Sequence, residues 1–378
     1  MYIKWNLTKK CTLGCKFCIN ADRRKEWNTD INGNDLENIL EQISKVSNLK
    51  GITLLGGDPL DYKYIFELAK GFEKHDVAFG FITAGEHLHS GKYDVLLKNK
   101  KLEFIGLSID SLNRKIVESI RGRDIIDSQL KSLDYLIQLR ERYNLNYKIF
   151  TNSILMNINK DSLIDLIDYF INKGIDKIQI LEYNHRENSK NDFSIPFSKE
   201  LIFIEDLISY LIPKLQENRE AISKLELCFL PELGKEYLEK RIKMGSLNKG
   251  NSNVCPVFRE TIFLSNDGFI YPCDSYKPYL KFDEETEIPE KIYTIENMLE
   301  TDLDDVINHN EYFRDLHELI NKPKGELYSN FEPCQDCDYL LKSCFPCLIV
   351  SENYKDETIV FGKCAKYKEL LTTEKVGK

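Results

Sequence analysis

Cysteines are the residues of this 378-residue chain with the clearest capacity for chemistry, and there are eleven of them. Ten lie in two groups, one close to residue 11 and one beyond residue 250. The first group holds Cys11, Cys15 and Cys18, and the second holds Cys255, Cys273, Cys334, Cys337, Cys344, Cys347 and Cys364. An odd, clustered set fits a disulfide scaffold poorly, and closely spaced cysteines in a reducing compartment bind metal more often than they pair.

The first group has the spacing CxxxCxxC, in the segment Cys11-Thr-Leu-Gly-Cys15-Lys-Phe-Cys18. One compact loop of this kind can place three thiolates around a [4Fe–4S] cluster and leave the fourth iron open to a substrate or cofactor. A structural zinc site is the alternative, but it normally needs a fourth Cys or His. The first histidine in the chain is His75. The spacing therefore favours a cluster.

The second group contains two CxxC pairs, a spacing typical of zinc ribbons, so zinc is the alternative there. Seven cysteines suit one four-cysteine site and one three-cysteine site better than a set of four-ligand zinc sites. Cys228 lies apart, within the apolar run 225–230. We expect it to be a buried, unreactive thiol, with a role as the missing ligand of the three-cysteine site as the alternative.

Alternating strands and helices must position the first cysteine group. Short β-rich runs are predicted at 2–6, 51–55, 78–83, 103–109, 147–153 and 177–181. Between them, apolar residues recur at helical spacing, for example over 36–46, 126–137 and 163–171. Six strand–helix units in series predict an α/β fold with parallel strands and outer helices, too few for a full eight-stranded barrel.

The second half of the chain loses this alternation. Helical patterns occur at 201–215 and 233–244, and the polar stretch 245–253 is the predicted linker. Asp267-Gly268 between two β-rich runs predicts a β-hairpin. We therefore expect a barrel domain over 1–183, a helical bridging segment over 184–253 and a cysteine-rich domain over 254–378.

The cysteine loop and the strand ends together resemble the radical S-adenosylmethionine (SAM) superfamily. Its signature is CxxxCx(aromatic)C after the first strand of a partial (β/α)6 barrel, and Phe17 fills the aromatic position. The second strand ends in Gly-Gly-Asp-Pro where the family has GGEP, so Asp58 replaces a glutamate. The resemblance implies these contacts to SAM: Phe17, Gly56, Gly57, Asp58, Pro59, Thr83, Ser108, Asp110, Arg121, Ile180 and Leu181.

The second cysteine group resembles the SPASM extension of radical SAM enzymes, a β-hairpin with loops that binds two auxiliary [4Fe–4S] clusters. With the first cluster, this resemblance implies three. By position, it assigns Cys334, Cys337, Cys344 and Cys364 to the distal cluster, and Cys255, Cys273 and Cys347 to the proximal cluster. No cysteine lies between 255 and 273, where several relatives have one. An open iron or a non-cysteine ligand is expected at the proximal cluster.

These resemblances imply an enzyme that cleaves SAM reductively and abstracts a hydrogen atom from its substrate. We predict a ribosomally made peptide as the substrate, receiving a cross-link, a thioether or an epimerised residue. The segment Tyr271-Pro-Cys-Asp274 resembles the YPCD of anaerobic sulfatase maturases, in which the aspartate accepts a proton during formylglycine formation. Sulfatase maturation is thus the alternative, with Asp274 as the catalytic candidate; a purely structural role is its other interpretation.

A small-molecule radical dehydrogenase is a third hypothesis for the enzymatic function. An iron–sulfur electron carrier or a zinc-bearing interaction module is the non-enzymatic one, which the combination of cysteine loop and glycine pair disfavours. An enzyme of this kind needs an electron donor such as flavodoxin or ferredoxin.

Composition narrows the expected partners and location. A net charge of −9 argues against nucleic acid as the main partner. No apolar run approaches the roughly 20 residues of a membrane span, and no secretory signal is recognisable, so we expect a cytoplasmic protein. Ten residues precede Cys11 and fourteen follow Cys364. No fused leader-binding domain is expected in these ends, and a separate leader-binding protein is the expected alternative.

Overall fold

The computed structural model describes residues 1–18, 20, 30–183, 193–243, 261–272, 296–311, 313–314, 337–338, 364, 366–370 and 372–373. Its centre is a nine-stranded sheet with the order β7-β6-β5-β4-β3-β2-β1-β8-β9. The strands are β1 (Tyr2–Thr8), β2 (Gly51–Gly56), β3 (Phe79–Thr83), β4 (Leu102–Ser108), β5 (Lys148–Leu155), β6 (Lys177–Glu182), β7 (Leu225–Leu227), β8 (Thr261–Leu264) and β9 (Ile270–Tyr271).

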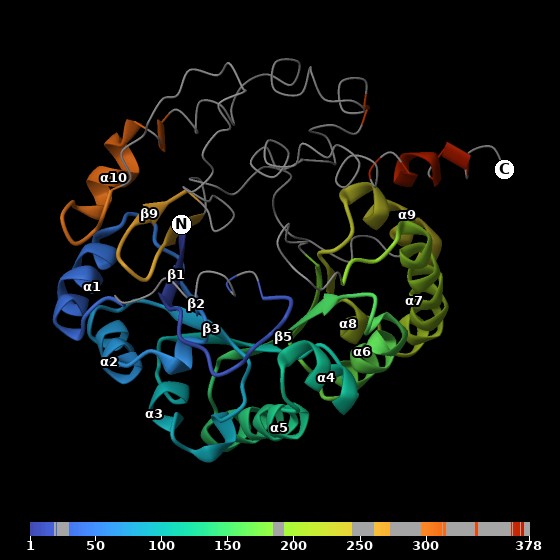
Figure 1. Cartoon of the computed structure of the whole chain (residues 1–378), viewed down its shortest axis with the longest axis horizontal. Coiled ribbons are helices and arrows are strands. Elements are labelled where there is room, and N and C mark those ends of the chain that lie inside the picture. Colours follow the sequence, from blue (N-terminus) through green and yellow to red (C-terminus); the bar gives the residue numbers. More distant parts are fainter. Residues whose placement is uncertain are drawn as a thin grey trace.

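Helices follow the outer side of the curved sheet (Figure 1). They are α1 (Leu36–Lys45), α2 (Ile65–Lys74), α3 (Asp94–Leu97), α4 (Arg114–Arg121), α5 (Ile126–Tyr143), α6 (Leu163–Asn172), α7 (Phe197–Glu217), α8 (Arg219–Ile222), α9 (Glu232–Ile242) and α10 (Leu303–His309). Short 3-10 turns are η2 (Gly33–Asp35), η3 (Pro59–Asp61), η4 (Leu88–Ser90) and η5 (Lys160–Ser162). No helix within the described ranges is long and apolar enough to cross a bilayer.

Strands β1 to β6 are adjacent in sequence order, and each pairs in parallel with the next. This arrangement confirms the predicted α/β fold with a partial barrel. Its carboxyl strand ends all lie at one edge, because every connection crosses back over the outer face through helical structure. Side chains that follow β1 to β6 in sequence are therefore brought to the same edge of the sheet.

Side-chain alternation divides each strand between a core face and an inner face. In β4, Ile105 and Leu107 are fully buried, whereas Phe104 and Ser108 are only half-buried on the opposite side. The predicted apolar stripe of α1 is likewise buried, through Leu36, Ile39, Leu40 and Ile43. The core thus lies between sheet and helices, and the concave inner face remains partly exposed.

A seventh parallel strand, β7, continues the barrel sheet beyond β6. The apolar run 225–230 predicts a short strand between two helices, but not that this strand joins the barrel sheet, because it follows the long crossover through α7 and α8. Cys228 follows β7, and the residue as a whole is exposed, but burial of its sulfur raises the pKa of Cys228 to about 11, which agrees with the expectation of an unreactive thiol. Its backbone N–H donates to the carbonyl oxygen of Ile180 at 2.7 Å, which places it at the carboxyl end of β6 and β7.

The predicted hairpin is present as antiparallel β8 and β9. Unexpectedly, β8 also pairs in parallel with β1, with Tyr2 opposite Thr261 and Trp5 opposite Leu264. The hairpin that begins the cysteine-rich region therefore extends the barrel sheet itself. The predicted domain boundaries at 183 and 253 remain predictions.

Candidate active site

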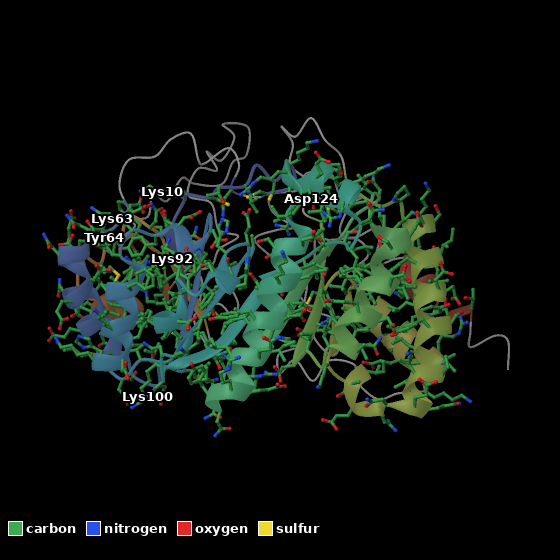
Figure 2. All side chains as sticks on the ribbon, turned by 90° about the horizontal axis from the view of Figure 1, so that it is seen from below. Lys10, Lys63, Tyr64, Lys92, Lys100 and Asp124 are labelled. Atoms are coloured by element: carbon green, nitrogen blue, oxygen red, sulfur yellow. The ribbon has the colours of Figure 1, made fainter. Side chains whose placement is uncertain are left out.

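The cysteine loop that follows β1 lies at the carboxyl edge of the barrel. Figure 2 shows Lys10 and Asp124 at this edge, and Lys100, which precedes β4, at the opposite one. Cys15 is buried, and Cys11 and Cys18 are half-buried. The Lys16 N–H donates to the Ile120 carbonyl oxygen at 2.8 Å, so the loop is fixed to the end of α4.

The glycine pair at the end of β2 lies directly against the cysteine loop. The Gly57 N–H donates to the Thr8 carbonyl oxygen at 2.7 Å, and the Asp58 N–H donates to the Lys10 carbonyl oxygen at 2.8 Å. A Cβ atom on Gly56 would lie 2.2 Å from the Thr8 oxygen, and one on Gly57 would lie 2.1 Å from the Lys10 oxygen. Only glycine permits this backbone approach, which fixes the residues before Cys11 relative to β2.

Asp58 connects the ends of β2 and β3 through a buried carboxylate. It accepts hydrogen bonds from the Thr83 hydroxyl at 2.7 Å, the Ala84 N–H at 3.0 Å and the Leu60 N–H at 3.0 Å. Burial raises the pKa of Asp58 to about 6 despite these donors. Both carboxylate oxygens are thus occupied by the protein, and Asp58 holds neighbouring strand ends in register. Pro59 is buried beside it as the first residue of η3.

Arg121, the last residue of α4, is buried between the cysteine loop and the end of β4. Its guanidinium donates to the Asp110 carboxylate at 2.5 Å, to the Ser108 carbonyl oxygen at 2.9 Å and to the Cys15 sulfur at 3.8 Å. It also lies 5.4 Å from the centre of the Phe17 ring. Burial alone would lower the pKa of Arg121, but the charges of Asp110 and Cys15 outweigh it and raise that pKa.

Polar and apolar side chains form rows across the inner face at the carboxyl ends of β4 to β6. Ser108 is opposite Asn152, Asn152 is opposite Gln179, and Ile154 is opposite Leu181. Leu181 is partly exposed, whereas its neighbour Ile180 is fully buried. The buried amide oxygen of Asn152 has no hydrogen-bond partner in the described part of the chain. Sequence reasoning missed Asn152; its even spacing from Phe150 along β5 is the signal that places it on the inner face.

These residues fit a [4Fe–4S] cluster at the first cysteine group. Three thiols lie on one loop, and a buried guanidinium beside Cys15 compensates negative charge there. No three His, Cys, Asp or Glu side chains of the described ranges are close enough to share a single ion. Of the second group, only Cys337 and Cys364 are described, and both are half-buried. The other residues predicted for that region lie outside the described residues: Cys255, Cys273, Asp274, Cys334, Cys344 and Cys347.

Two regions of the chain match known protein families in sequence. The family described as the radical SAM superfamily matches residues 5–180, and an iron–sulfur cluster-binding domain, SPASM, matches residues 255–338. Among curated proteins, the chain is similar to a probable GTP 3′,8-cyclase of Pyrococcus abyssi, at 25% identity over 72% of this chain and 83% of that protein. A GTP 3′,8-cyclase of Helicobacter pylori is 26% identical over 73% of this chain and 81% of its own length.

Structural comparison extends the similarity to nearly the whole chain. Streptococcus suis SuiB bound to the precursor peptide SuiA has a TM-score of 0.68 at 20% identity, covering 94% of this chain and 73% of that one. Native anSMEcpe with bound AdoMet and the Cp18Cys peptide has a TM-score of 0.66 at 15% identity, covering 97% and 94%. The cysteine loop, the parallel strands and the two matched regions agree: the chain belongs to the radical SAM superfamily and is an enzyme of that superfamily with a SPASM domain.

Proposed function

We propose that this radical SAM enzyme modifies a ribosomally made peptide, by installing a cross-link, a thioether or an epimerised residue. The supporting observation is that its similarity to SuiB and anSMEcpe, both solved with peptides, extends over 94% and 97% of the chain. The curated cyclases match 72–73% of it in sequence. A shared fold supports the substrate class but does not by itself define the bond that forms.

The chain's own residues have three roles in this proposal. A cluster on Cys11, Cys15 and Cys18, when bound, supplies the electron that cleaves SAM to methionine and a 5′-deoxyadenosyl radical. The backbone around Gly57, fixed by the cysteine loop, receives the methionine end of SAM. The rows through Ser108 and Leu181 receive the ribose and adenine. The concave face then holds the substrate close to the 5′ carbon and excludes water from it.

We further propose that the SPASM region holds two auxiliary clusters through the cysteines assigned above. Clusters held by these cysteines would accept the electron that the substrate radical loses after hydrogen abstraction, or would offer the substrate an open iron at the proximal site. Flavodoxin or ferredoxin is the proposed electron donor, and a small separate protein is proposed to capture the leader peptide.

Two other substrates are favoured by specific observations. Asp274, in a segment that resembles YPCD, favours a sulfatase-type substrate. The curated relatives favour GTP.

One assay separates these substrates. The reduced holoenzyme is incubated with SAM and, in separate reactions, a precursor peptide encoded beside its gene, a sulfatase-motif peptide, or GTP. We expect 5′-deoxyadenosine formation to rise and a mass change to occur with the precursor only. Turnover of GTP or of the sulfatase peptide, with an unchanged precursor, would contradict the proposal. A leaderless core peptide, with and without the candidate leader-binding protein, tests the partner.

Asp274 is tested with the substrate that turns over. If it is a general base, Asp274→Asn should suppress product while 5′-deoxyadenosine still forms, because hydrogen abstraction precedes deprotonation. Equal product formation by the variant and the wild type would show that Asp274 is not the general base and would leave it a structural role.

A further inference from the structure

The helical turn that carries Cys364 is fixed to the barrel by a buried tyrosine. Tyr367 is fully buried, and its hydroxyl donates to the carboxylate of Glu200, on α7, at 2.6 Å. Its ring meets the ring of Phe197, the first residue of α7, edge-on with centres 5.1 Å apart. In Figure 1 the red helical turns after residue 364 lie beside α9 and α7.

Helix α9 is shaped to receive this ring. Gly234 lies on α9, and a Cβ atom there would be 2.9 Å from Cε1 and 3.0 Å from Cζ of Tyr367. A contact that close requires the Tyr367 ring or one of the two helices to shift. Glycine is a poorer helix former than alanine, so the position of Gly234, the third residue of α9, against the Tyr367 ring indicates a packing requirement.

Glu200 is suited to hold the hydroxyl. It is 3% exposed, and it lies in the first turn of α7, where the helix dipole stabilises a carboxylate. Burial, and then the charge of Glu200, raise the pKa of Tyr367, so the phenol remains a donor.

Residues three apart on a helix lie on the same face. Cys364 and Tyr367 have this separation, and both are helical. We propose that Tyr367, Glu200 and Gly234 form a latch that positions Cys364 as a ligand of an auxiliary cluster. The segment between the barrel strands and the SPASM region thereby becomes the platform for the last cysteine of the chain. This inference rests on the auxiliary clusters of the proposed function.

The test uses the full-length chain with Cys11, Cys15 and Cys18 replaced by Ala, so that all remaining iron belongs to the auxiliary clusters. Two substitutions are introduced separately into this chain. Tyr367→Phe removes only the hydroxyl, and Gly234→Ala leaves the hydroxyl and displaces the ring. The matched control is Tyr237→Phe. Tyr237 is buried on α9 and donates to Glu205 of α7 at 2.7 Å, in a tyrosine–glutamate pair that does not involve the Cys364 helix.

Two quantities are measured anaerobically: iron per chain, and the rate at which iodoacetamide alkylates Cys364, followed by mass spectrometry of its peptide. We expect Tyr367→Phe and Gly234→Ala to raise this rate at least about tenfold, the factor that matches loss of one hydrogen bond to a charged group. Auxiliary iron should fall in both variants. Tyr237→Phe should lower the melting temperature without changing either quantity.

The variant Cys364→Ser distinguishes the proposed ligand role of Cys364 from the proposed latch. If this variant keeps all auxiliary iron, Cys364 is not a ligand, and the auxiliary-cluster assignment fails. If it loses iron while Tyr367→Phe and Gly234→Ala behave like Tyr237→Phe, the ligand assignment stands and the latch is refuted.

Discussion

Arg121 and Asp110 form a buried ion pair at the point where α4, the end of β4 and the cysteine loop meet. We expect Arg121→Gln to destabilise the protein by about 3–5 kcal/mol, because it leaves the Asp110 carboxylate buried without its counter-charge. The double variant Arg121→Gln, Asp110→Asn should recover part of this loss. The measurement is the free energy of unfolding in urea for the two single variants and the double variant.

Arg114 provides the control for that experiment. It is exposed at the start of the same helix and pairs with Asp124 and Asp127. Its replacement by Gln should change the unfolding free energy little, because exposed pairs contribute little. Additive effects of the two substitutions at 121 and 110 would show that the pair is not coupled.

The raised pKa of Asp58 predicts that the stability of the protein depends on pH. Its folded-state pKa of about 6 exceeds the ordinary value of 3.8, so the folded protein binds more protons than the unfolded chain between these values. Stability therefore falls as pH rises through this window. A pKa difference of about two corresponds to about 3 kcal/mol.

The measurement compares the unfolding free energies of wild type and Asp58→Asn from pH 4 to 6.5. The variant lacks the titration, so the wild type should lose stability relative to it by up to about 3 kcal/mol. Asp161→Asn, which removes an exposed carboxylate, should follow the wild type. A constant difference between wild type and Asp58→Asn would rule out the burial effect.

At the scale of elements, the contact between the end of β2 and the cysteine loop depends on glycine at specific positions. We expect Gly57→Ala to abolish binding of the first cluster, because its Cβ atom would lie 2.1 Å from the Lys10 carbonyl oxygen. Gly14→Ala is the matched control within the loop, since a Cβ there would lie more than 4 Å from every other described residue except its two chain neighbours. Iron content and 5′-deoxyadenosine formation distinguish the two. Equal iron in both variants would contradict the steric argument.

The strands of the barrel were predictable to within one or two residues, because each is a short apolar run between turn signals. The predicted helices do not include α4, although three apolar residues at helical spacing, Ile116, Val117 and Ile120, lie among its eight residues. Contacts between segments that are distant in the chain could not be predicted from the sequence either. The contact of Arg121 with Cys15 spans 106 residues, and only the folded chain brings α4 against the cysteine loop.

At the scale of the whole molecule, metal content tests the division into three clusters. Anaerobically prepared protein should hold about twelve irons per chain, by the stoichiometry of four irons per cluster. Replacing Cys11, Cys15 and Cys18 together should leave about eight and abolish SAM cleavage. Stoichiometric zinc with only about four irons would overturn the auxiliary-cluster assignment. Metal analysis and iron–sulfur spectroscopy provide the readout.

The pairing of β8 with β1 has a consequence for how the protein is made. Strand β2 follows β1 by about 40 residues and can cover one edge of β1 early. The other edge of β1 remains open until Thr261–Leu264 has been synthesised. An open strand edge is a template for aggregation, and so distant a pairing forms slowly. A nascent chain therefore has to protect β1 while the roughly 250 residues between β1 and β8 are made, a period in which a chaperone is a natural partner.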